Sequence, residues 1–277
     1  MSFFQTVLKI MDHQMKTPRL FGWFHMLSLA LTVLITFLLC FRHREDQPER
    51  VRKVVLGTAL LTILLEIYKQ INYSFSYTDG ITFDYQWYAF PFQFCSTPMY
   101  VGLLAGLLKK GKLQDALYAY LATFAVFAGA CVMIYPGDVF VGTTGINIQT
   151  VICHGSMIVI GVYLMYTGTV KLEHRTVMKA MAVFACTVSM AVIMNEIAYF
   201  SGLLEREVFN MFFVSRHCDP SLPVYSLVQA MVPYPWCLIV YIVGFTLAAY
   251  LLLLLGMGIQ RLGSRLVSPG KQRLRVG

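Results

Sequence analysis

Two side chains of this 277-residue chain are suited to covalent chemistry, the thiol of Cys95 and the imidazole of His154. A thiol attacks as the thiolate, and apolar surroundings raise its pKa, so a nucleophilic cysteine needs a base within hydrogen-bond reach. A carboxylate can then hold the imidazole in the tautomer that accepts the proton. These residue types predict acyl transfer. The sequence alone does not show whether Cys95 and His154 meet.

Cys95 lies in the stretch Phe90-Pro91-Phe-Gln-Phe-Cys-Ser-Thr-Pro98. The two prolines lack a backbone N–H and push the residue before each away from helical geometry. We therefore predict a broken entry into an apolar helix around Cys95. Irregular backbone at membrane depth is tolerated only where protein or a watery cavity surrounds it. This makes Cys95 the leading candidate for a functional site, and the alternative is a small apolar packing residue.

The elements that must position these residues are membrane helices. The chain is 57% apolar and only 13% charged, with a mean hydropathy of +0.64, whereas a soluble domain carries about 25% charged residues. Several apolar runs of about 18 residues or more predict an all-α, polytopic membrane protein. The net charge of +8 lies mostly in short loops, which is a topology signal and not a nucleic-acid signature.

The seven cysteines form no CxxC pair, so the sequence predicts neither a disulfide framework nor a zinc site. One candidate histidine and scattered carboxylates do not make a metal site, and we expect no metal and no cofactor. Cys153 is adjacent to His154 but points to a different helix face, so adjacency does not predict a pair.

We predict a seven-helix transmembrane domain at residues 20–257, with a polar lead-in at 1–19 and a basic tail at 258–277. The predicted spans cover residues 20–41, 54–75, 95–108, 116–135, 148–166, 177–201 and 233–257. Lys and Arg concentrate in the tail and in the loops after the first, third and fifth spans. This asymmetry predicts an external N-terminus and a cytoplasmic C-terminus, in a multi-pass protein of the cell membrane.

Polar side chains inside the spans gather at one predicted depth. Intramembrane ionisable groups are costly, so each needs a partner or a function. With a rise of about 1.5 Å per residue, several spans direct such groups at one layer in the external half of the bundle. The layer consists of Glu66, Lys69, Asn72, Cys95, His154, Asn195 and Glu196, with Gln93 and Trp236 at its edge.

In the catalytic interpretation, Cys95 attacks and His154 takes the proton, with membrane lipid as the natural substrate. Glu66 or Glu196 orients His154, and Lys69 or Asn195 steadies the developing oxyanion or the head group. Gln93, Asn72 and Trp236 complete the substrate pocket.

Structural roles are open for the same residues. Glu66 and Lys69 can simply neutralise each other, His154 can be a satisfied core histidine, and Asn195 with Glu196 can join helices. A different function class is also open, a transporter or sensor that uses the buried charges as a relay. A third alternative is a structural partner subunit, with the polar layer fully self-paired.

The motifs resemble a known family. They are Phe90-Pro-Phe-Gln-Phe-Cys95, His154-Gly155, Asn195 and Val232-Pro-Tyr-Pro-Trp236, in matching order over about residues 20–255. Together they are similar to YwaF-type integral membrane proteins of bacteria. That family is related to the eukaryotic transmembrane protein 164 group, which resembles AIG1/ADTRP-like lipid hydrolases in fold.

The eukaryotic group is described as phospholipid acyltransferases that work through a cysteine and a histidine. The resemblance therefore implies Cys95 as the acyl-accepting nucleophile and His154 as the base. One position departs from the bacterial pattern, which commonly has a histidine where this chain has Gln93. A glutamine cannot act as a base, so any activating role of that histidine is not carried over.

Overall fold

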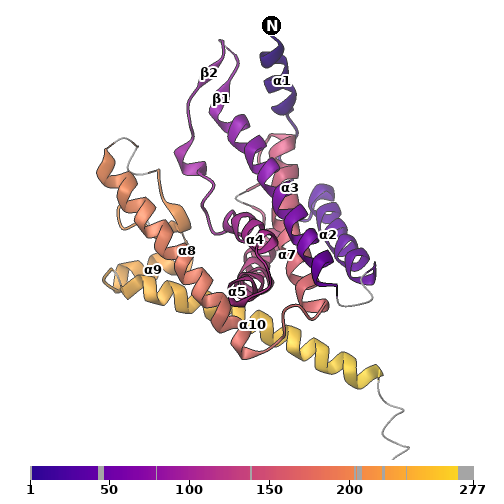
Figure 1. The fold of residues 1–277 in the computed structure, drawn as a ribbon. Coiled ribbons are helices and arrows are strands. Elements are labelled where there is room, and N and C mark those ends of the chain that lie inside the picture. Colours follow the sequence, from indigo (N-terminus) through magenta and orange to yellow (C-terminus); the bar gives the residue numbers. More distant parts are fainter. Residues whose placement is uncertain are drawn as a thin grey trace, which may run out of the picture.

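The computed structural model describes residues 2–42, 47–78, 80–137, 139–202, 204, 208–219, 222–234 and 236–267. The predicted all-α class is confirmed, with one short antiparallel hairpin of β1 (Phe75–Ser76) and β2 (Thr82–Phe83) (Figure 1). The α-helices are α1 (Phe3–Met11), α2 (Trp23–Arg42), α3 (Pro48–Ser74), α4 (Thr97–Leu107), α5 (Lys112–Tyr120), α6 (Val126–Ile134), α7 (Thr144–Tyr166), α8 (His174–Ser201), α9 (Pro223–Met231) and α10 (Trp236–Val267). Shorter elements are the 3-10 turns η1 (Trp87–Ala89) and η3 (Met211–Phe213) and the π-helical turn η2 (Leu121–Ala125).

Six helical segments of the described chain are long and apolar enough to cross a membrane. They are α2, α3, the continuous segment Lys112–Ile134, α7, α8 and residues Trp236–Gly258 of α10. The chain is therefore a multi-pass membrane protein. The remaining predicted span corresponds to α4, whose 11 residues extend only about 16 Å, against a hydrocarbon core of about 30 Å. Residues 90–96 before it are not helical, as the two prolines predict.

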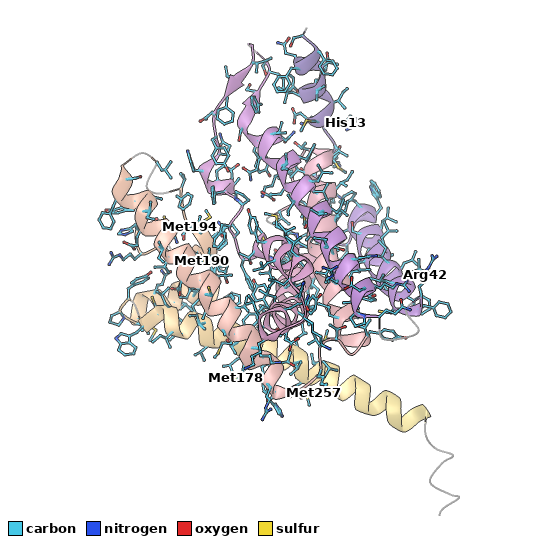
Figure 2. All side chains as sticks on the ribbon, viewed as in Figure 1. His13, Arg42, Met178, Met190, Met194 and Met257 are labelled. Carbon is cyan, nitrogen blue, oxygen red and sulfur yellow. The ribbon has the colours of Figure 1, made fainter. Side chains whose placement is uncertain are left out.

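The continuous segment of α5, η2 and α6 forms the centre of the bundle. Figure 1 shows α4 and α5 enclosed by α3 and α7 on one side and by α8 and α10 on the other. Phe124 and Phe184 are fully buried there, and their rings stack with centroids 4.5 Å apart. By contrast, α8 exposes the side chains of Met178 and Met190, which are labelled in Figure 2. An apolar outward face is what a lipid-facing helix requires.

Two glycine contacts fix the part of α7 that carries His154. Gly129 of α6 faces the backbone of α7, where a Cβ would lie 2.6 Å from the carbonyl oxygen of His154. On the other side, a Cβ on Gly155 would lie 2.8 Å from the hydroxyl of Thr32 in α2. Small residues let neighbouring helices approach this closely within a membrane. The position of His154 therefore depends on glycine packing on both sides of α7.

We expect Gly129→Ala to destabilise the protein by about 1–3 kcal/mol, because the added methyl forces α6 and α7 apart. A lower thermal unfolding midpoint in detergent measures this. Gly57→Ala is the matched control, since nothing lies within 4 Å of a Cβ there, and a helical glycine-to-alanine change favours the helix by up to about 1 kcal/mol. Equal midpoints for the two variants would contradict the packing argument.

Candidate functional site

A cavity of about 240 Å³ lies between α3, α7 and the entry to α4. We call the end of the bundle with the β1–β2 hairpin and the start of α7 the hairpin end. Toward this end the cavity is lined by polar side chains, which are Glu66, Lys69, Tyr73 and Gln149, beside apolar residues of the 139–146 segment. Toward the opposite end the lining is mostly apolar, with Val55, Ala59, Gly102, Met157 and Ile160. Cys95 and His154 both line this cavity.

The ring of His154 is held in one tautomer by its own helix. Its Nδ1–H donates to the carbonyl oxygen of Thr150, one turn earlier, over 2.7 Å. Because a carbonyl only accepts, Nε2 of the neutral ring carries the lone pair. His154 is buried, and Nε2 has no hydrogen-bond partner among the residues that the structure describes. A buried ring nitrogen without a partner, on a residue that lines a cavity, can accept a proton from a bound group.

The thiol of Cys95 is free and partly buried in the irregular segment before α4. A turn forms around it, because the amides of Ser96 and Thr97 both donate to the carbonyl of Gln93. Below the turn, the hydroxyl of Thr97 lies 2.8 Å from that of the fully buried Tyr120.

A buried ion pair lies at the polar end of the cavity. Lys69 Nζ is 2.8 Å from Glu66 Oε1, and the amide of Gln70 donates to the same oxygen over 2.7 Å. The amide of Gln149 on α7 lies 3.5 Å from the other carboxylate oxygen. The predicted pairing of Glu66 with Lys69 is therefore present. The carboxylate does not bond His154, whose Nδ1–H is already taken by the backbone of Thr150.

We expect Lys69→Met to destabilise the protein by about 3–5 kcal/mol, because it leaves the buried carboxylate of Glu66 unpaired. The double variant with Glu66→Gln should recover most of the loss, since no lone charge remains. Chemical or thermal unfolding of the single and double variants measures this. The control pair is Lys179 with Asp115, half-exposed and 3.8 Å apart, whose loss should cost no more than about 1 kcal/mol.

Comparison with known proteins gives one result. The family model of the TMEM164 family matches residues 20–255, which is most of the chain and includes every residue of the cavity. The chain belongs to the TMEM164 family. No match was found among curated proteins or among solved structures.

In this TMEM164-family chain the cavity also contains residues that the motifs did not predict. Cys153 lines it together with His154, although the two point to different faces of α7. Gln149 also lines the cavity and donates to the sulfur of Cys153 over 3.5 Å. Gln149 and Cys153 are spaced i, i+4, which places them on one face of α7, and this spacing is the signal in the sequence that could have identified them as a pair.

Five of the nine predicted site residues do not line the cavity. Gln93 and Asn195 instead bond the backbone of the connector between α8 and α9. Asn72 lines a second cavity of about 180 Å³ under α1. Trp236 is 63% exposed at the start of α10.

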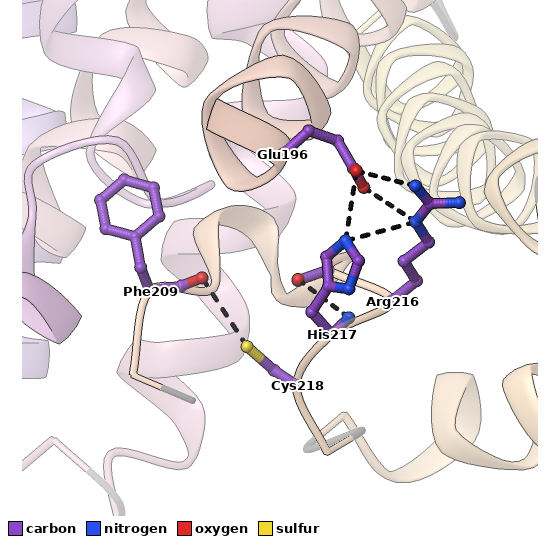
Figure 3. Close-up of polar contacts among 6 residues, drawn as sticks. Glu196, Phe209, Arg216, His217 and Cys218 are labelled. Carbon is purple, nitrogen blue, oxygen red and sulfur yellow. Dashed lines mark hydrogen bonds and ion pairs between the residues drawn. The ribbon is translucent and has the colours of Figure 1, made fainter. Parts of the chain in front are cut away.

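Glu196 also lies away from the cavity. Its carboxylate binds Arg216 at 2.8 Å and His217 at 3.2 Å, both in the connector (Figure 3). The predicted single layer thus divides into a cavity group on α3, α7 and the irregular segment before α4, and a connector group formed by Gln93 and two residues of α8. The reason is that depth follows from position along a helix, whereas direction depends on the neighbouring helices. Across the described part of the chain, no group of three His, Cys, Asp or Glu side chains could hold a metal ion.

Proposed function

We propose that this membrane protein catalyses thiol-dependent acyl transfer or hydrolysis on a lipid, with Cys95 as nucleophile and His154 as base. The observation that carries the proposal is one cavity lined by the free thiol of Cys95 and by His154, whose Nε2 has no partner in the described chain. Membership of the TMEM164 family is consistent with it. The fixed tautomer of His154 supports the assigned direction of proton transfer.

The reaction takes place in two steps. Nε2 of His154 accepts the thiol proton, and the sulfur attacks the carbonyl carbon of the lipid ester. The carbon–oxygen bond to the lipid alcohol breaks, the imidazolium returns the proton to that alcohol, and a thioester remains on Cys95. In the second step His154 deprotonates an acceptor alcohol or water, which attacks the thioester and releases the Cys95 thiolate. The imidazolium then returns that proton to the sulfur, which restores the thiol and the neutral His154. Transfer and hydrolysis differ only in this acceptor.

The polarity of the cavity supports a lipid as the substrate. An ester lies between a polar head and an apolar chain, and the cavity that Cys95 lines has both polar and apolar residues. Lys69 and Gln149 are the donors available for the oxyanion or head group. Asn195, the other predicted donor, is occupied by the backbone of Met211, and the backbone carbonyl of Thr150 takes the orienting role assigned to Glu66 or Glu196.

We further propose a seventh crossing of the cell membrane, formed by residues 89–107. Ala89 accepts a bond from Gln70 near the hairpin end of α3, and Gly106 lies against Leu56 near its other end. These contacts are about 21 Å apart along α3 at about 1.5 Å per residue, so the irregular segment and α4 together run antiparallel to much of α3. Seven crossings place the two termini on opposite sides of the membrane, and the Lys and Arg bias of the loops then makes the N-terminus external and the C-terminus cytoplasmic. Accessibility of single added cysteines at Thr78 and Lys110 to an impermeant reagent should differ, and equal accessibility from one side would contradict this topology.

The experiment that tests the proposed function is labelling of the detergent-purified protein with a lipid-like acyl-thioester probe, followed by mass spectrometry. We expect an adduct on Cys95 that is lost in His154→Ala. Cys218, whose sulfur bonds the carbonyl of Phe209 in the connector, serves as the internal reference thiol (Figure 3). Reaction only at Cys218, or at no cysteine, would overturn the proposal. The buried pair of Glu66 and Lys69 would then favour a transporter or sensor.

A further inference from the structure

The connector between α8 and α9 enters the bundle at residues Asn210–Phe213, which we call the plug. Met211 and Phe212 are fully buried, and the hydroxyl of Tyr241 on α10 donates to the carbonyl of Phe212 over 3.0 Å. Phe212 and Phe213 have φ angles of 59° and 57°, a left-handed conformation that bulky side chains rarely adopt. Such strain persists only where the surroundings determine the backbone, and it is concentrated at functional sites.

The plug contacts all three residues that precede Cys95. The side-chain amide of Gln93 donates to the carbonyl of Asn210 over 3.0 Å, and its oxygen accepts the amide N–H of Phe212 over 2.8 Å. The rings of Phe92 and Phe94 also contact the ring of Phe212, with centroid distances of 6.0 Å and 5.8 Å. The loop of the nucleophile is thus supported by a segment more than 100 residues later in the chain.

A second amide fixes the plug to α8 in the same manner. Asn195 donates to the carbonyl of Met211 over 3.0 Å and accepts the amide N–H of the same residue over 2.8 Å. The next residue, Glu196, anchors the far end of the connector through Arg216 and His217 (Figure 3). The connector is therefore attached to α8 on both sides of its strained turn.

We propose that the plug sets the position of the Cys95 thiol in the cavity, and that Gln93 and Asn195 are positioning residues that act through it. Each amide satisfies both a donor and an acceptor of the plug backbone, which gives the Cys95 loop one geometry. The inference rests on the proposed function only for its effect on turnover. The support that the plug gives to the Cys95 loop does not depend on the proposed function.

The test combines hydrogen–deuterium exchange with kinetics on the purified full-length protein carrying Asn195→Ala or Gln93→Ala. We expect exchange to rise at residues 90–97 and to remain unchanged at 149–157. In an acyl-transfer assay kcat should fall by about 10- to 100-fold with little change in KM, because a displaced nucleophile loses alignment and not substrate binding. Tyr241→Phe, which removes one bond to the plug, should give the same pattern more weakly.

Gln114→Ala is the matched control. That amide also makes two bonds to backbone, to the carbonyls of Ala105 and Leu108, but at the far end of α4. It should raise exchange around residues 105–111 and leave kcat unchanged. Unchanged exchange at 90–97 in the plug variants, or an equal rise across the whole chain, would overturn the inference. A local rise at 90–97 together with full turnover in Cys95→Ser would support the positioning role and refute the proposed function.

Discussion

Replacing Cys95 by serine is expected to lower acyl transfer from a lipid ester by more than about 10³-fold. The substitution keeps the size and place of the side chain but replaces the thiol with a hydroxyl, which ionises far less readily and is a weaker nucleophile. His154 is oriented by a backbone carbonyl and not by a carboxylate. As a base of this kind it can deprotonate a thiol more readily than a hydroxyl, because a thiol is the stronger acid. Turnover of a radiolabelled or fluorescent lipid ester by the purified variant measures the effect.

Cys153→Ser is the control for this prediction. Cys153 lines the same cavity, and its sulfur accepts a bond from Gln149, yet the proposed mechanism gives it no step. Its substitution should change turnover by less than about threefold, because no transition-state interaction is lost. If Cys153→Ser removed activity and Cys95→Ser retained it, the nucleophile would be Cys153.

The second large effect is expected for His154→Gln, which should lower kcat by about 10²- to 10⁴-fold, the range for removal of a general base. The glutamine amide can still donate to the carbonyl of Thr150, so local structure is preserved, but it cannot take a proton. KM should change little, because the imidazole is not required for substrate binding. Single-turnover formation of the Cys95 thioester isolates the step that is expected to slow.

Ser156→Ala is the matched control on the same helix. Ser156 also lines the cavity, and its hydroxyl donates to the carbonyl of Cys153 within α7. Losing this local bond should leave kcat unchanged. A His154→Gln variant with normal kcat but a lower unfolding midpoint would show that His154 is a core histidine with a structural role only.

The sequence determined the membrane class and the regular helices. Apolar length is a local property, so each long run forms a helix, and most bounds lie within about four residues of the predicted ones. Two helices are longer than predicted: α3 begins at Pro48, and α10 continues to Val267, so the first part of the predicted basic tail (258–277) is helical. Local end signals act in the same way, as at Gly202, whose φ of 66° ends α8. The broken entry before α4 was also predictable, because Pro91 and Pro98 restrict the backbone without help from distant residues.

The sequence also predicts which polar residues share a depth, since the prediction uses helical rise alone. The direction of each side chain is a different matter. Cys95 and His154 were predicted at one layer with Asn195 and Glu196, yet only the first two line the cavity. The rotation of a helix about its own axis decides which way its side chains point. This rotation depends on the helices that pack against it, and those come from distant parts of the chain.

Long-range packing assigns the roles of the remaining polar groups. Gln93 and Asn195 have the residue types of a catalytic site, but their amides are satisfied by a plug backbone contributed by the connector. No local pattern encodes that contact, because Phe212 adopts a left-handed backbone that its own residue type disfavours. The sequence by itself determined the helices and the chemical groups available. Long-range packing determined which of these groups meet, because the partners of a buried polar group are set by the whole fold and not by its neighbours in sequence.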